Sequence, residues 1–165
     1  MAEIVKRQDS RRTFVDTLNK LAQSDPNIIC IICDVGFLYL DDPKNKFRVI
    51  NLGVTEQSAT MIATALALSG FKVFLYSMIN FVLFRPAEMV RNGIVCHKAP
   101  VTLIGVKGSS SYRFLGFSHN LLHENEDLMF CENIGLEHHT PQTNEEVEDV
   151  ITDCYYSNKP NYVRL

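Results

Sequence analysis

The sequence predicts an α/β fold of three layers, α/β/α, with a mostly parallel, doubly wound sheet. Short apolar runs typical of strands alternate with helical segments through almost the whole chain, and the connections between them are short. One run, residues 28–33, is apolar at every position, as in a strand buried on both faces. This alternation indicates right-handed crossovers between parallel strands, with helices on both faces. A chain of 165 residues, 46% of them hydrophobic, has enough apolar material for one domain, 1–165.

The first half of the chain supplies two strands and two helices. Apolar residues at helical spacing predict a helix from Ser10, as its N-cap, to Gln23. The strand at 28–33 is followed by a polar, irregular segment, 34–46, and then by a strand at 47–52. A helix rich in Ala and Met is expected at 55–69, because Gly70 can end it at the C′ position.

The second half continues the alternation. We expect strands at 72–76, 101–106, 134–137 and 162–165, and helices at 81–97 and 125–131. Thr143 and Glu146 form a capping box that begins a last helix, to about Tyr156. Ligands of open parallel sheets bind beyond the carboxyl ends of the strands. The segments from Asp34 onward, 53–56 and 107–123 therefore predict a site at that edge.

Composition and charge exclude several classes of protein. The net charge of −3 and the 21% of charged residues leave no basic stripe for nucleic acid. No apolar run reaches the roughly 20 residues that a bilayer span needs, and residues 1–12 are too polar for a secretory signal. Five cysteines, an odd count, indicate reduced thiols, and Cys30 and Cys33 lie inside a strand, which favours core packing over a redox or zinc role. We expect a soluble, cytoplasmic protein.

The most informative segment is 51–57, NLGVTEQ, because it places Glu56 directly after an apolar strand in the opening turn of a helix. From its position alone, Glu56 is either a solvated acid favoured by the helix dipole or a partly buried carboxyl group that holds or shares a proton.

An ordered set of motifs, together with this segment, closely resembles the pyrimidine-binding domain of transketolase-like, thiamine-diphosphate-dependent enzymes. The resemblance covers nearly the whole chain. The further matching motifs are 65–70 (ALALSG), 73–77 (VFLYS), Asn80-Phe81, Glu88-x-x-Arg91-Asn92, Gly116-x-x-His119, Glu126-Asp127 and 160–165 (PNYVRL).

The resemblance implies that Glu56 is catalytic. In that family a glutamate at this position hydrogen-bonds the N1′ nitrogen of the aminopyrimidine ring. The shared proton favours the imino form of the 4′-amino group, which then removes the proton from C2 of the thiazolium. Such a role needs a carboxyl group in a dry pocket, where burial favours the protonated form.

Other site residues are also implied by the resemblance. Phe81 and Ile79 are the candidates for contact with the pyrimidine ring, although animal and plant transketolases place aromatic residues partly at the positions of Ile79, Val82 and Arg85. Core packing is the alternative role of Phe81. Asp34 matches an acid near the cofactor or the subunit seam, or it caps a loop. His119 matches a histidine that binds substrate, with His123 as its competitor and a solvated loop histidine as the alternative for either.

The sequence lacks the Gly-Asp-Gly and later Asn with which these enzymes hold Mg²⁺ and the diphosphate. Asp41 and Asp42 are adjacent carboxylates, but they lack the surrounding motif that such a Mg²⁺ and diphosphate site needs. The resemblance therefore implies a diphosphate-binding transketolase subunit on another chain that holds Mg²⁺, in a heterotetramer or by homodimer pairing. A naturally split subunit and a domain cut from a longer enzyme both fit.

The implied activity is ketol (two-carbon) transfer between phosphosugars, or related C–C chemistry on a sugar phosphate or a 2-oxo acid. A split 2-oxo acid decarboxylase subunit and a catalytically silent regulatory paralogue remain the alternatives.

Overall fold

A computed structural model of the protein describes residues 9–108 and 110–165. Residues 1–8 of the predicted domain and Ser109, in the segment 107–123, lie outside the described residues. The described residues form one six-stranded sheet in which every pairing is parallel, in the order β2-β1-β3-β4-β6-β5. The strands are β1 (Ile28–Ile32), β2 (Arg48–Asn51), β3 (Lys72–Met78), β4 (Val101–Val106), β5 (Glu137–His139) and β6 (Asn161–Arg164).

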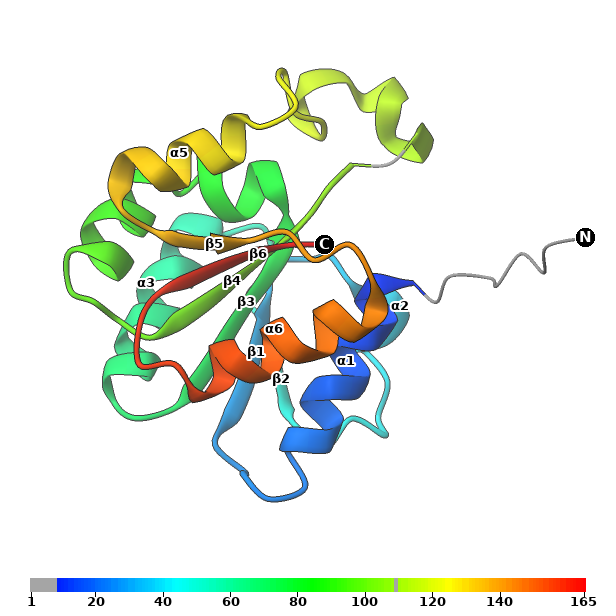
Figure 1. Ribbon diagram of the computed structural model, residues 1–165, viewed down its shortest axis with the longest axis vertical. Helices are drawn as coiled ribbons and strands as arrows, with labels where there is room; N and C mark the ends of the chain where they lie inside the picture. The colour runs from blue at the N-terminus through cyan, green and yellow to red at the C-terminus, as the bar shows by residue number, and fades with distance from the viewer. Residues whose placement is uncertain (1–8, 109) are drawn as a thin grey trace, which may run out of the picture.

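Helices cover both faces of this sheet, so the predicted three-layer, doubly wound fold is confirmed. In Figure 1, α1 and α6 lie on one face of the sheet, while α3 and α5 lie on the other. The helices are α1 (Ser10–Leu21), α2 (Phe37–Leu40), α3 (Glu56–Leu68), η1 (Asn80–Phe84), α4 (Ala87–Met89), η2 (Val90–Val95), η3 (Ser110–Ser118), α5 (Glu126–Ile134) and α6 (Asn144–Tyr156).

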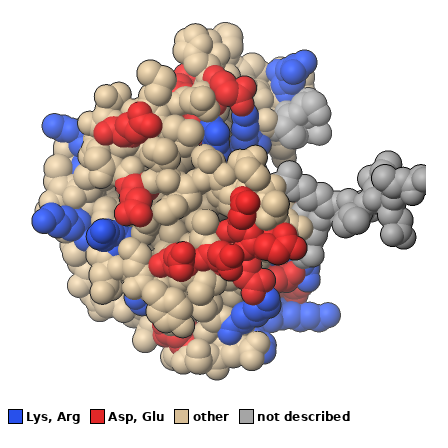
Figure 2. Space-filling model, in the orientation of Figure 1, with Lys and Arg blue, Asp and Glu red and all other residues tan. Residues whose placement is uncertain are grey.

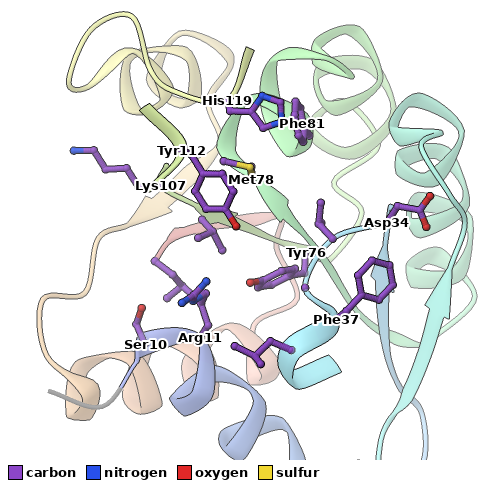
Figure 3. Close-up of a pocket in the computed structure, with 15 residues that line it drawn as sticks. Ser10, Arg11, Asp34, Phe37, Tyr76, Met78, Phe81, Lys107, Tyr112 and His119 are labelled. Atoms are coloured by element: carbon purple, nitrogen blue, oxygen red, sulfur yellow. The ribbon is translucent and has the colours of Figure 1, made fainter. Parts of the chain in front are cut away.

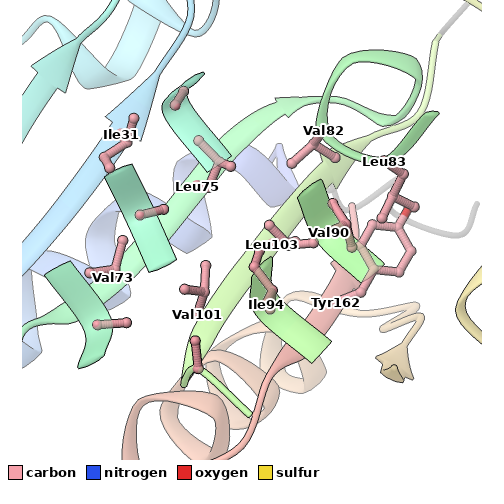
Figure 4. Close-up of a cluster of buried hydrophobic side chains, with 14 of the residues drawn as sticks. Ile31, Val73, Leu75, Val82, Leu83, Val90, Ile94, Val101, Leu103 and Tyr162 are labelled. Atoms are coloured by element: carbon pink, nitrogen blue, oxygen red, sulfur yellow. The ribbon is translucent and has the colours of Figure 1, made fainter. Parts of the chain in front are cut away.

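Each face of the sheet carries its own apolar core. All five residues of β1 are buried, because their side chains alternate between the two cores. Figure 4 shows part of the core beneath α3, with Ile31, Leu75 and Leu103 from three strands. The small residues of α3 that face this core, Ala59, Ala63 and Ala67, are all buried, so that the helix lies close to the sheet.

The cap of α1, the segment after β1 and the start of β5 differ from the predictions. Asp9, not Ser10, caps α1, since its carboxylate accepts the Arg11 backbone N–H at 3.0 Å, and a charged acceptor makes a stronger bond than a hydroxyl. The segment 34–46, predicted to be irregular, contains α2, which is too short to show a helical period. Strand β5 begins at Glu137, because α5 continues to Ile134 and ends at Gly135, whose φ of +73° is easy only for glycine.

The predicted helix at 81–97 is not one α-helix. Two π-helical segments, η1 and η2, flank α4, and the backbone N–H of Arg85 donates to the Asn80 carbonyl, five residues back, at 2.9 Å. Pro86 interrupts the α-helical ladder, because it has no N–H and its ring clashes with the carbonyl four residues earlier. Such wide turns are rare and occur frequently at functional sites.

The capping box of α6 is half formed. Thr143 Oγ1 accepts the Glu146 N–H at 3.1 Å, as predicted, but the Glu146 carboxylate accepts the Gln142 N–H at 2.6 Å instead of the Thr143 N–H. Acidic side chains gather over α6 in Figure 2; this helix carries Glu145, Glu146, Glu148, Asp149 and Asp153.

Cys30 and Cys33 have the packing role expected of them. Cys30, Cys33, Cys131 and Cys154 are buried free thiols, and Cys96 is an exposed one. Burial raises the pKa of the Cys33 thiol to about 11, which opposes the thiolate that redox chemistry needs. Within the described ranges, none of the helices combines the length and apolar character that crossing a membrane requires.

Candidate active site

The candidate site lies where four parallel strands end. Because β1 to β4 run in the same direction, the segments that follow them meet at one edge of the sheet. These segments carry Asp34 after β1, Glu56 after β2, Phe81 after β3 and His119 beyond β4. The edge predicted from the sequence is therefore the one at which the structure gathers these residues.

Glu56 is the first residue of α3, and it is buried, with 5% of its surface exposed. The turn before it depends on Gly53, whose φ is +69° and whose N–H donates to Asn51 Oδ1 at 3.0 Å. Thr55 Oγ1 donates to the Leu52 carbonyl at 2.8 Å and so holds the turn from the other side. Burial excludes the solvated-acid interpretation of Glu56.

The carboxylate of Glu56 is ion-paired. Arg85 Nη1 donates to Glu56 Oε1 at 2.5 Å, and 41% of the Arg85 side chain is exposed. The pair therefore joins a buried anion to a cation at the surface. Because such a charge-assisted bond is stronger than a neutral one, it holds the Glu56 side chain toward Arg85 in this structure.

Arg85 also covers the ring that was predicted to contact the pyrimidine. The Arg85 Cζ atom lies 4.1 Å from the centroid of the Phe81 ring, a cation–π distance. The ring of His119 meets the Phe81 ring nearly at right angles, at 81° and 4.9 Å between centroids. Glu56, Arg85, Phe81 and His119 thus form one continuous row of contacts.

Asp34 is held by Asn51, the last residue of β2. Its φ of +53° lies in the left-handed region, and its backbone N–H donates to Asn51 Oδ1 at 3.1 Å. Asn51 Nδ2 donates in turn to Asp34 Oδ1 at 2.9 Å. The Asp34 carboxylate points away from Tyr76 in Figure 3. Asp34 therefore ties the ends of β1 and β2 together at the rim of the site.

A cavity of about 590 Å³ opens beside this row of contacts, a size that suits a small ligand. Asp34, Phe81 and His119 line it, whereas Glu56 does not, since Arg85 lies over its carboxylate. The other residues that line it include Ser10, Arg11, Gly36, Phe37, Tyr76, Met78, Lys107 and Tyr112 (Figure 3).

The predicted residues differ in access to this cavity. Ile79 is 1% exposed and packs in the core beneath α3, so its side chain supports the site from below and does not line the cavity. Phe81 is 8% exposed, and it both packs and lines the cavity. Of the two histidines, His119 lines the cavity, and its Nδ1 lies 2.7 Å from Ser118 Oγ, whereas His123 is exposed and outside the lining.

Sequence reasoning missed three residues of the site. The sequence indicated Arg85 only as a departure from an aromatic position, although its spacing of four residues from Phe81 was a signal that the two side chains share a helix face. Arg11 and Tyr76 line the cavity from α1 and β3, which only the folded topology brings together. Burial raises the pKa of the Tyr76 hydroxyl, and Arg11, ion-paired with Asp9, holds the pKa of that carboxyl below its usual range.

A buried network joins the start of α5 to β6. Asp127 is fully buried, and it accepts the Tyr162 hydroxyl at 2.8 Å and Arg164 Nη1 at 3.1 Å. Arg164 Nη1 also donates to the Glu124 carbonyl at 3.1 Å. Burial, with Asp127 beside it, raises the pKa of Tyr162 well above its usual range. The network joins two of the sequence motifs, Glu126-Asp127 and the C-terminal segment.

No group of three or more His, Cys, Asp or Glu side chains in 9–108 and 110–165 is arranged to hold a metal ion.

The fold and its buried acid at the strand ends agree with a family comparison. Residues 6–165 match the family described as "Transketolase, pyrimidine binding domain", and the chain belongs to this family. Transketolases depend on thiamine diphosphate. A buried carboxylate beside an aromatic ring fits the aminopyrimidine part of that cofactor, because the two groups offer a hydrogen-bond partner and a flat apolar contact.

Among characterised relatives, the chain is similar to an apulose-4-phosphate transketolase subunit of Phocaeicola vulgatus, with 33% identity over 117 residues, which cover 69% of this chain and 38% of the relative. The corresponding apulose-4-phosphate transketolase subunit of Actinobacillus succinogenes is 27% identical over 119 residues, covering 72% and 37%. The chain thus spans less than two-fifths of the length of these relatives.

Solved structures share the fold. "Split gene transketolase, inactive beta4 tetramer" superposes with a TM-score of 0.80 at 23% identity, covering 94% of this chain and 50% of that one. Transketolase from Campylobacter jejuni gives 0.77 at 18% identity, covering 96% and 26%. A transketolase variant from Pichia stipitis gives 0.82 at 18% identity, covering 99% and 26%.

Proposed function

We propose that this chain is the pyrimidine-binding subunit of a split, cytoplasmic transketolase-like enzyme, in which Glu56 activates thiamine diphosphate for ketol transfer between phosphosugars or related C–C chemistry. The observation that carries the proposal is the position of Glu56. It is buried in the first turn of α3, at the strand ends, one side chain away from the ring of Phe81.

The residues of the site divide the work between them. Phe81 offers an apolar face on which a flat heterocycle packs, and Ile79 packs in the core beneath α3. Glu56 lies buried at the strand ends, where its carboxyl group pairs with a ring nitrogen and shares a proton with it. His119 lies at the cavity wall, where an imidazole can donate to or accept from a hydroxylated substrate. Asp34 keeps the rim of the cavity in place. The cofactor supplies the nucleophilic carbon.

A partner chain completes the proposed site. Large apolar side chains are exposed on and before α3, and a surface of this kind is typical of an interface; they are Val54, Met61, Ile62 and Leu68. The proposed partner binds the diphosphate and Mg²⁺, for which this sequence has no Gly-Asp-Gly motif. The similar proteins include a transketolase subunit and a split-gene transketolase, which supports an assembly of separate chains, as a heterotetramer or by homodimer pairing.

The proposal is tested by mixing the chain with a candidate diphosphate-binding subunit and measuring thiamine diphosphate binding and ketol transfer. We expect tight cofactor binding and turnover only in the mixture. Glu56→Gln should lower turnover by about 10²- to 10⁴-fold, the usual contribution of a general acid or base, while the far-UV circular dichroism spectrum stays unchanged.

The matched control is Glu145→Gln, which neutralises an exposed acid of α6 and should leave turnover unchanged. Near-normal turnover of Glu56→Gln would remove the assignment of this residue. Tight binding of the cofactor by the chain alone would contradict the split site.

The ion pair favours one second candidate, a catalytically silent regulatory subunit, because Arg85 blocks the access of a ligand to Glu56. A split 2-oxo acid decarboxylase subunit would share the cofactor and differ in substrate. Assays of the mixture with phosphosugars and with small 2-oxo acids separate the three candidates.

A further inference from the structure

The side chain of Arg85 contacts both Glu56 and Phe81, the two residues that the proposed function assigns to the aminopyrimidine ring. Its guanidinium donates to the Glu56 carboxylate at 2.5 Å and lies over the Phe81 ring at 4.1 Å from the centroid. A guanidinium is a planar group with N–H donors at its edge and an apolar face. It therefore satisfies a carboxylate at its edge and an aromatic ring at its face at the same time.

An aminopyrimidine bound to the same two residues has the same requirements. It is planar, its edge pairs with the carboxyl group of Glu56, and its face packs on an aromatic ring. The guanidinium and the aminopyrimidine cannot bind together, because both need the Glu56 carboxylate and the same face of the Phe81 ring. Binding of one therefore displaces the other.

The ion pair also occupies the hydrogen-bonding edge of Glu56. Arg85 Nη1 bonds to Glu56 Oε1, the group that the proposed function pairs with a ring nitrogen. Departure of Arg85 would leave a buried carboxyl group without its partner, which is costly unless another group bonds to it. The same movement would free the space beside Phe81 for the aminopyrimidine ring.

Arg85 is placed to make this movement. Its side chain is 41% exposed, so it can turn toward solvent, while its backbone N–H is held by Asn80 at 2.9 Å. We propose that Arg85 is a latch, which occupies the place of the aminopyrimidine ring in the isolated chain and leaves Glu56 when the cofactor binds. This inference rests on the proposed function, because it takes the ring of thiamine diphosphate as the competing ligand.

The test measures cofactor affinity in the assembled enzyme by titration calorimetry, with thiamine diphosphate and Mg²⁺. Arg85→Gln should bind thiamine diphosphate about tenfold more tightly than the wild type, because no arginine then competes with the cofactor for Glu56 and Phe81. In a Glu56→Gln background the same replacement should change the affinity less than about twofold, since the ion pair is already absent. Arg85→Lys keeps the charge without the planar group, and its affinity should lie between those of the wild type and Arg85→Gln.

The control is Arg48→Gln, which removes an exposed arginine at the amino end of β2, away from the site, and should leave the affinity unchanged. Circular dichroism checks that each variant is folded, and Arg85→Lys tests the latch should Arg85→Gln fail to fold. Equal or weaker binding by Arg85→Gln and Arg85→Lys, in an enzyme whose wild type binds the cofactor, overturns the latch alone. Absence of binding by the wild-type mixture overturns the proposed function and the latch with it.

Discussion

Removal of the Asp127 carboxylate should destabilise the protein more than removal of an exposed acid does. In Asp127→Ala the buried Tyr162 hydroxyl loses its acceptor, which costs about 1–3 kcal/mol. Arg164, whose side chain is only 15% exposed, loses its ion partner, and breaking a buried pair costs about 3–5 kcal/mol. Because Arg164 keeps its bond to the Glu124 carbonyl, we expect a total near the lower limit of the two costs together, about 4 kcal/mol.

The assay is urea unfolding at pH 7, followed by far-UV circular dichroism, because the chain has no tryptophan for fluorescence. Asp127→Asn retains an acceptor for Tyr162 and should lose less stability than Asp127→Ala. The matched control, Asp149→Ala, removes an exposed acid of α6 and should change the free energy of unfolding by less than about 0.5 kcal/mol. A loss below about 1 kcal/mol in Asp127→Ala would refute the reasoning, since the network would then contribute no more than a surface pair.

Two further predictions concern the same core. Gly105→Ala would place a Cβ atom 2.6 Å from the buried Tyr162 ring, and should lower the free energy of unfolding by about 1–3 kcal/mol, measured by thermal unfolding; an unchanged Tm would show that the ring yields without strain. Burial raises the pKa of Cys33 to about 11 and of Cys131 to about 12, from an ordinary value near 9, so the folded state holds these protons more tightly than the unfolded state. The free energy of unfolding should therefore be highest below about pH 9 and should fall between about pH 9 and 12. Urea unfolding at each pH measures it. A constant free energy of unfolding across that range would contradict the raised pKa values of the two thiols.

The strands and the site-bearing edge could be predicted from the sequence because their signals are local. An apolar run such as 28–33 reports burial on two faces without reference to the rest of the chain. Once parallel strands are inferred, the position of Glu56 after β2 follows from connectivity alone. The ordered motifs then indicated the family, which residues 6–165 match.

The contact of Arg85 with Glu56 could not be predicted, because it depends on helix geometry that the apolar pattern does not encode. The spacing at 81–97 predicts an α-helix, and only the π-helical turns around Pro86 set how Arg85 is turned relative to Glu56 and Phe81. The approach of His119 to Phe81 likewise joins segments that are far apart in the chain. The hydrophobic pattern of the sequence does not show which residues from distant segments come into contact.

The wide turns of η1 have a consequence for insertions and deletions in this chain. A π turn contains one residue more than an α turn, and in an α-helix each residue advances the facing direction by about 100°. Loss of a single residue between Phe81 and Arg85 would restore regular pitch and reduce the spacing of these two side chains from four residues to three. Chains that differ here by one residue would keep the same sheet and helices while presenting different side chains at the edge where the candidate site lies.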